Sequence, residues 1–234
     1  MSMVAKSTQF IWERISLPHA KRKLDYESIV RATITLADSG GLSAVSMRNV
    51  AAKLDVGTMS LYRYVTGKDD LLDLILDAAY GEIKLPRSSN MPWQQRFRRI
   101  AMESRRVLKR HPWLGPLLSR RPTLGPNYLR WFENLLAATA SRNRDMRTRV
   151  RMIGTVWSYI SGFIAYELGE METNRRHNLT EARKRRMIQP YVAQITESGN
   201  YPCLAEFLKS DVGEPTDEDF LAGLNAVLKG IELM

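Results

Sequence analysis

The sequence predicts an all-α protein, in which a small N-terminal three-helix module precedes a larger helical body. Apolar residues recur every three or four positions along almost the whole chain of 234 residues, which is the spacing of amphipathic helices. No sustained alternation of polar and β-branched residues indicates a strand, and glycine and proline fall between the periodic segments. With 44% hydrophobic and 26% charged residues, the chain can bury one or two substantial cores, which excludes wholesale disorder.

The first two expected helices carry clear end signals. After a polar extension over residues 1–23, a helix is expected to begin at Asp25 and to stop at the glycine pair that ends with Gly41. Ser46 can then cap a short helix over residues 47–54. The basic run at the end of the extension, Lys21-Arg22-Lys23, is either a solvated tail or an arm that reaches phosphate.

A tight turn connects this short helix to the next one. Residues 55–57 are too few for anything else, and a third short helix is expected over residues 58–64. Two short helices joined in this way form a helix-turn-helix unit. Thr66, with Asp69 three residues later, can cap a longer helix that ends near residue 83.

The remaining helices form the larger body. Pro92 suits the first position of a helix, and Thr216 can cap the last one because three acidic residues follow it. The expected helices span residues 92–110, 126–142, 145–172, 179–197, 203–209 and 216–231. Short loops between long helices favour helix-on-helix packing.

Composition restricts the partner and the compartment. Lys and Arg number 35 against 25 Asp and Glu, and the net charge of +10 favours an anionic partner such as nucleic acid or an acidic membrane surface. No apolar run reaches the roughly 18 to 20 residues that span a bilayer, and no signal peptide is recognisable. A single cysteine, Cys203, permits no intramolecular disulfide. We therefore expect a cytoplasmic protein without a membrane partner.

The segment from Ser46 to Leu72 carries a specific resemblance. It reads Ser-Met-Arg-Asn-Val-Ala-Ala-Lys-Leu-Asp-Val-Gly-Thr-Met-Ser-Leu-Tyr-Arg-Tyr-Val-Thr-Gly-Lys-Asp-Asp-Leu-Leu. This segment resembles the DNA-binding part of tetracycline-repressor-like (TetR family) transcription regulators. The resemblance implies a helix-turn-helix DNA-binding domain over residues 24–70. It also implies a helical domain for effector binding and dimerisation over residues 71–234.

The family resemblance indicates which side chains face the DNA. The matching positions are Ser46, Arg48, Thr58, Met59, Ser60, Tyr62, Tyr64 and Lys68. Hydroxyls, a phenol and a lysine can bind phosphate, and Arg48 has the fork that pairs with guanine. For Tyr62 and Tyr64 a place in the core, or at phosphate without base contact, remains an equal alternative. Asp55 stands where the family usually has glycine at a left-handed turn position, a conformation that aspartate tolerates.

Aromatic side chains are frequent in the body, where they could line a cavity for an apolar, planar effector. The candidates for ligand contact are Trp113, Trp131, Met152, Trp157, Phe163 and Tyr166. Each of them can instead fill an ordinary core, and the resemblance favours a cavity without selecting individual residues. The arginines of residues 96–110 form either a solvated surface or the wall of an anionic pocket.

Two helices of the body carry patterns that suit a dimer interface. One has a stripe of small residues and the last one has an apolar stripe, and together they give the expected interface: Gly154, Ser158, Gly162, Ala165, Phe220, Leu224, Val227, Leu228 and Ile231. Either stripe can instead pack within one chain. A two-fold-symmetric DNA reader needs a self-complementary interface, which favours a four-helix bundle between two subunits.

No local signature of enzyme chemistry is present. The sequence has no glycine-rich phosphate loop, no GxSxG and no HExxH, and its three histidines are far apart, so we expect no catalytic residue, metal or cofactor. The expected function is a transcription repressor that binds double-stranded DNA at a palindromic operator as a homodimer. A largely apolar small-molecule effector is expected to release it. The alternative is a helical enzyme or small-molecule carrier that retained a helix-turn-helix.

Overall fold

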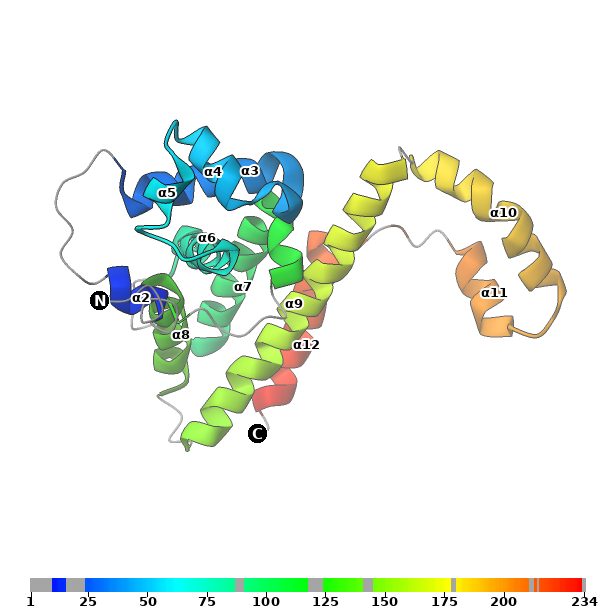
Figure 1. Ribbon diagram of the computed structural model, residues 1–234. Helices are drawn as coiled ribbons and strands as arrows, with labels where there is room; N and C mark the ends of the chain where they lie inside the picture. Colours follow the sequence, from blue (N-terminus) through cyan, green and yellow to red (C-terminus); the bar gives the residue numbers. More distant parts are fainter. Residues whose placement is uncertain are drawn as a thin grey trace.

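The computed structural model describes residues 10–15, 24–86, 91–117, 124–140, 145–177, 180–210, 213 and 215–232. Every regular element within these ranges is a helix, which confirms the all-α prediction (Figure 1). The basic run from Lys21 to Lys23, which we expected to be a tail or an arm, lies outside the described residues.

The first long helix, α3 (Tyr26–Ala44), begins at the expected cap. Asp25 accepts a hydrogen bond from the backbone N–H of Ser28 at 2.7 Å. Gly41 has a φ of 67°, so the regular helix is interrupted there as expected, although one further turn continues to Ala44. Glycine suits this left-handed conformation because it has no Cβ.

The helix-turn-helix consists of α4 (Met47–Lys53) and α5 (Thr58–Leu61). Ser46 caps α4 by accepting a hydrogen bond from the N–H of Asn49 at 3.1 Å, as its position predicts. Asp55 has a φ of 53°, the left-handed conformation expected at this turn position. The start of α4 and the turn that precedes α5 are therefore fixed by local signals.

The next helix, α6 (Lys68–Glu82), links the module to the body. Its start differs in detail from the expected cap, because Thr66 pairs with Asp70 instead of Asp69. The N–H and the hydroxyl of Thr66 donate to Asp70 Oδ2 at 2.6 and 2.8 Å. The helix passes residue 70, where we expected a domain boundary, without interruption, and it packs against helices on both sides of that position.

The body is built around one long helix. Its elements are α7 (Trp93–Arg110), the 3-10 helix η1 (Pro112–Leu117), α8 (Pro126–Thr139), α9 (Met146–His177) and α12 (Asp217–Glu232). α9 packs against α7, α8, η1 and α12, so it is the helix that most of the core shares. None of the described helices is long and apolar enough to cross a membrane.

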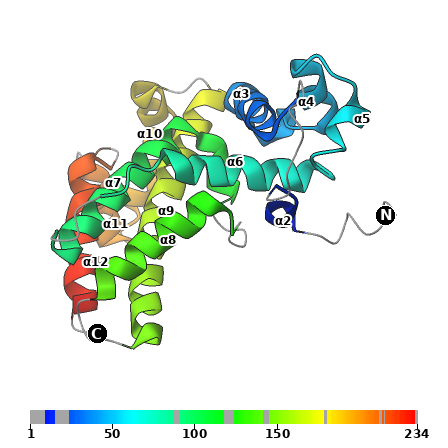
Figure 2. The same cartoon turned by 90° about the vertical axis from the view of Figure 1, so that its left-hand side faces the viewer.

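Two elements were not expected from the sequence. One is η1, and the other is α2 (Ile11–Ile15) within the N-terminal extension. Arg14 of α2 is buried and donates to the carboxylate of Asp70 and to the backbone oxygen of Tyr64. α2 thus lies at the junction between the N-terminal module and the body (Figure 2).

The helices α10 (Glu181–Glu197) and α11 (Pro202–Lys209) form an arm that extends away from the body (Figure 1). The main packing partner of each is the other. Their ranges agree with the two helices expected in this region.

Candidate DNA interface and effector cavity

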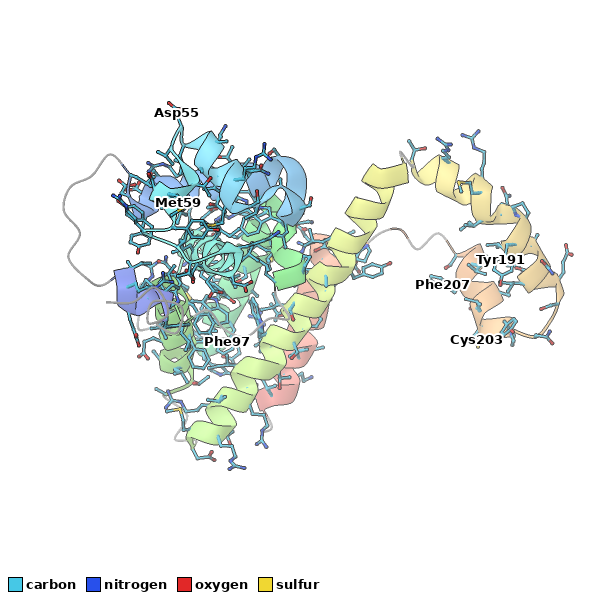
Figure 3. All side chains as sticks on the ribbon, viewed as in Figure 1. Asp55, Met59, Phe97, Tyr191, Cys203 and Phe207 are labelled. Carbon is cyan, nitrogen blue, oxygen red and sulfur yellow. The ribbon has the colours of Figure 1, made fainter. Side chains whose placement is uncertain are left out.

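The outer face of the helix-turn-helix exposes most of the side chains expected to meet DNA. Met59 and Tyr62 are 74% and 46% exposed, and Arg48 and Lys68 are also exposed. Ser46, Thr58 and Ser60 are half-buried. Figure 3 places Asp55 and Met59 in the N-terminal module, away from the core position marked by Phe97.

Tyr64 does not belong to this face. Its side chain is 6% exposed, its ring packs edge-on against Tyr26 with the centroids 5.3 Å apart, and its hydroxyl donates to the backbone oxygen of Leu24. The expectation that Tyr64 faces DNA is therefore wrong, because the core of the module holds both its ring and its hydroxyl.

Lys68 lies at the first residue of α6, beside the recognition face. Its Nζ donates to the backbone oxygen of Leu42 at 2.7 Å, yet the side chain remains exposed. An ammonium group has three donors, so two remain for a phosphate. The position agrees with a phosphate contact.

An apolar cavity lies in the body between α6, α7, η1 and α9. Its lining consists of Leu76, Ala79, Tyr80, Ile83, Ser104, Val107, Leu108, Leu114 and Trp157. The cavity is small, with a volume of about 20 Å³. Drug-sized ligands need roughly 300 to 1,000 Å³. An organic effector therefore requires the walls to move apart.

Ser104 is the polar member of the lining that stands out. The residue is 1% exposed, and its Oγ has no hydrogen-bond partner among the described residues. A buried hydroxyl without a partner costs free energy, so such groups are uncommon in folded proteins. Ser104 is placed to donate to, or accept from, a polar atom of an otherwise apolar ligand.

The six aromatic and methionine residues expected to contact a ligand do not gather around one cavity. Trp157 lines the cavity. Trp131 and Met152 are buried outside the lining, and Trp113 donates its Nε1–H to Asp38 at 2.6 Å. The other two residues also lie outside the lining, and their contact with a ligand stays a prediction. The Tyr166 side chain is 58% exposed, and the Phe163 ring packs on Phe220 of α12 at 5.1 Å.

Tyr80 of α6 is a cavity residue that the sequence did not indicate. Its ring centroid lies 5.2 Å from that of Trp131 and 6.4 Å from that of Trp157, so the three rings form one aromatic cluster, of which Tyr80 and Trp157 line the cavity. Burial raises the pKa of the Tyr80 hydroxyl, which therefore stays protonated. The aromatic candidates from the sequence all lie beyond residue 92, whereas Tyr80 belongs to α6, a helix rich in buried apolar side chains.

A polar cluster joins the N-terminal module to the body beside the cavity. His111 is 4% exposed, and its Nδ1 and Nε2 lie 2.7 Å from Asp38 Oδ1 and 3.1 Å from Glu82 Oε1. Asp38 belongs to α3 of the module, and Glu82 ends α6 of the body. The same Asp38 oxygen accepts the Trp113 hydrogen bond, so this carboxylate ties α3 to the segment that follows α7.

The two expected dimer surfaces behave differently. On α9, Gly154, Ser158, Gly162 and Ala165 are exposed, and a Cβ added at either glycine would meet nothing within 4 Å. On α12, the apolar stripe packs within the chain: Phe220, Leu224, Leu228 and Ile231 are at most 2% exposed, and Val227 is half-buried. The expectation that these four buried residues form the dimer seam is wrong, because they fill the core against α9 and α7.

A metal site has no support in the part of the chain that the structure describes. No three or more His, Cys, Asp or Glu side chains there gather in a way that could hold an ion.

Comparison with known proteins agrees with this architecture. Residues 29–80 match the family model of bacterial regulatory proteins of the tetR family, and residues 85–234 match that of the tetracyclin repressor-like C-terminal domain. The two matches leave residues 81–84 between them, and the boundary after residue 70 stays a prediction.

Curated relatives and solved structures extend the comparison. The HTH-type transcriptional repressor DrrR1 of Streptomyces coeruleorubidus is 33% identical over 99% of this chain and 86% of its own. An HTH-type transcriptional regulator of Saccharopolyspora erythraea is 34% identical over 83% of this chain and 79% of its own. The Streptomyces coelicolor protein ActR, in complex with (S)-DNPA, has a TM-score of 0.72 at 23% identity and covers 91% of this chain and 99% of its own. The chain therefore belongs to the TetR family and is a DNA-binding transcription regulator, not an enzyme.

Proposed function

We propose that the protein is a homodimeric repressor that binds a palindromic operator and leaves it when an effector enters the apolar cavity. The observation that carries this proposal is the position of the cavity. Its lining residues Ile83, Leu108 and Leu114 adjoin the Asp38, His111 and Glu82 cluster that ties α3 to the body. A ligand in the cavity is thus within a few residues of the connection to the DNA-binding module.

Seven side chains are proposed to contact the operator. They are Ser46, Arg48, Thr58, Met59, Ser60, Tyr62 and Lys68. The exposed Arg48 has the geometry for guanine, and the exposed Met59 can pack on a thymine methyl. Lys68 and the hydroxyls are suited to phosphate, which sets register and orientation without reading sequence.

The uncovered face of α9 is the proposed dimer seam. Its small residues allow close approach of another helix, because their side chains leave room for the partner's backbone and side chains. A two-fold axis through this face sets two recognition helices in successive major grooves, about 34–36 Å apart.

Effector binding is proposed to act by opening the cavity. An effector that requires the wider cavity binds the expanded conformation better than the compact one, and this difference in affinity is what shifts the equilibrium. Movement of α6 or of the end of α7 displaces Glu82 or His111 relative to Asp38. The module then rotates with α3, and the two recognition helices lose the spacing that the operator requires.

Selection from random duplex DNA tests the DNA half of the proposal. We expect an enriched palindrome whose binding weakens steeply with salt. The Arg48→Ala variant is expected to lose base preference at one position of each half-site. Lys68→Ala is expected to weaken binding to all sequences alike and to reduce the salt slope by about one per chain. If selection yields no enriched palindrome at moderate salt, the operator proposal is wrong.

Tryptophan fluorescence tests the effector half. Trp157 lines the cavity and its ring lies 5.0 Å from that of Trp131, so a bound aromatic compound is expected to quench both. ActR has been solved with actinorhodin as well as (S)-DNPA, and these two compounds are the first to screen here. Ser104→Ala is expected to weaken binding about tenfold, as the loss of one buried hydrogen bond does. A compound that releases DNA without quenching Trp157 would contradict the cavity as the effector site.

A bulky substitution tests the dimer. Ser158→Trp places an indole on the uncovered face of α9 and is expected to give a folded monomer with much weaker operator binding. Ala137→Trp, on the exposed side of α8, is the matched control and is expected to remain a dimer. Leu224→Asp is unsuitable, because Leu224 is 0% exposed in the core of its own chain. Sedimentation that shows Ser158→Trp to be as dimeric as the parent would place the seam elsewhere.

A further inference from the structure

The short helix α2 is held in place by the rest of the chain. A helix of fewer than roughly 12–15 residues is marginal in isolation, and α2 has 5. Ile11 is 2% exposed, Trp12 and Ile15 are half-buried against the core, and Glu13 is exposed. The contacts that α2 makes, and not its own hydrogen bonds, therefore determine where it lies.

Arg14 connects α2 to the segment that follows α5, the second helix of the helix-turn-helix. Its Nη1 donates at 3.3 Å to the backbone oxygen of Tyr64, three residues after α5 ends. Its Nη2 pairs with Asp70 of α6, and the two side chains are only 10% and 15% exposed. Because Asp70 also accepts the two hydrogen bonds from Thr66, one carboxylate fixes both α2 and the turn between α5 and α6.

Trp12 connects the same helix to the body. Its ring lies against Gly125, the residue that precedes α8, because a Cβ added at Gly125 would come within 2.6 Å of Trp12 Cζ2. At this point the backbone N–H groups of Asn127 and Tyr128 donate to Asp77 of α6. α2 thus lies beside the junction of α6 and α8, below the helix-turn-helix in the view of Figure 1.

We propose that α2 fixes the orientation of the helix-turn-helix on the body, with Arg14 and Trp12 as its positioning residues. The inference rests on the proposed homodimer and assigns to α2 a part in selecting the spacing of the two half-sites. The Asp38 and His111 contact attaches α3 to the body at a different place. Two attachments at separate points restrict a rotation that either one alone would allow.

The spacing of the half-sites gives this role a readout that stability does not change. One base pair added between two half-sites moves them about 3.4 Å further apart and rotates one against the other by about a tenth of a turn. A module held in one orientation cannot follow this displacement, whereas a module that rotates on the body can. Loss of the α2 contacts is therefore expected to reduce discrimination between operators of different spacing.

Binding titrations of the full-length protein use three duplexes: the selected palindrome, and the same palindrome with one central base pair added or removed. Arg14→Gln and Trp12→Ala are each expected to weaken binding to the selected palindrome about tenfold, the size of an ordinary coupling between two sites, and to leave binding to the other two duplexes unchanged. Arg14→Lys keeps a cation for Asp70 and is expected to restore most of the preference. Glu13→Ala, at the exposed position of the same helix, is the matched control.

The outcomes separate this inference from the proposal on which it rests. Circular dichroism and sedimentation are expected to show both variants folded and dimeric. An equal loss of affinity for all three duplexes, an unchanged preference, or loss of the fold in both variants overturns the positioning role of α2 and leaves the operator proposal intact. A parent protein that binds the three duplexes equally well overturns both.

Discussion

Removal of Arg105 is expected to be among the most damaging single substitutions in the body. Arg105 is 3% exposed, and its Nε and Nη2 donate to the two oxygens of Glu167 at 2.8 and 2.6 Å. It also pairs with Asp217 of α12, and its guanidinium lies 4.9 Å from the centre of the Phe220 ring. One side chain of α7 therefore holds α9 and α12 together.

The expected loss follows from the charge that would be left behind. In Arg105→Ala, the buried Glu167 keeps Lys109 as its one cationic partner among the described residues, with the Lys109 Nζ 3.0 Å away. Breaking a buried ion pair by removing one partner costs about 3–5 kcal/mol, against a total stability of about 5–15 kcal/mol for an ordinary domain. The double variant Arg105→Met, Glu167→Met removes both charges and is expected to stay within about 1 kcal/mol of the parent.

Urea unfolding followed by circular dichroism, at one fixed protomer concentration, measures these differences. Arg31→Ala is the control, because its partner Glu27 lies four residues earlier on the same helix and the two side chains are 63% and 80% exposed. An exposed pair of this kind contributes about 0.3–0.5 kcal/mol. A loss below 1 kcal/mol for Arg105→Ala, or a double variant as unstable as the single one, would refute the reasoning.

The same cluster gives the stability a pH dependence of defined sign. Burial alone raises the pKa of Glu167, but hydrogen bonds from Arg105 and Lys109 outweigh it and hold that pKa below its ordinary value of 4.5. A carboxyl whose pKa is lower in the folded state contributes stability in full above the unfolded value and loses it as pH falls through the folded value. We expect the parent to lose stability below about pH 4.5 more steeply than the double variant.

Three further predictions concern the cavity, the α6 to α8 contact and the recognition face. Ser104→Ala is expected to raise the free energy of unfolding by about 1 kcal/mol, because it deletes a buried hydroxyl without a partner among the described residues; a decrease in urea unfolding would contradict this. Gly125→Ala is expected to lower the free energy of unfolding by about 1–3 kcal/mol, since the new Cβ would lie 2.3 Å from the Asp77 carboxylate; an unchanged melting temperature would show that the site yields. Tyr64→Phe is expected to cost about 0.5–1.5 kcal/mol of stability, whereas Tyr62→Phe is expected to reduce only operator affinity in a binding titration; the reverse pattern would exchange their roles.

The elements that the sequence predicted well are those fixed by interactions within a few residues. Ser46 caps α4 through Asn49, and Thr216 exchanges hydrogen bonds with Asp219 at the start of α12. Such contacts depend only on residue type and on spacing along the chain, so they can be predicted from the sequence. Asp70 in place of Asp69 is the exception, because the turn around Gly67 decides which carboxylate reaches Thr66.

The features that the sequence could not predict depend on which surfaces meet across the fold. The apolar stripe through Leu224 signals burial, but it is the same whether the covering helix comes from its own chain or from a second one. The structure covers it with helices of its own chain and leaves the small residues around Ser158 open. For the same reason Trp157 lines the cavity and Tyr166 does not, because their places around α9 depend on its rotation against α7 and η1.

α9 places strong limits on how this protein can be modified. Trp157 faces the cavity, Glu167 joins the buried ion pair and Ser158 lies on the proposed seam, all within one helix of 32 residues. Substitutions in α9 that are intended to change which effector the protein responds to would therefore change stability or assembly at the same time. Ser104 and Val107 of α7 line the same cavity without lying on the α9 seam. A library randomised at these two positions is the practical starting point for new ligand responses.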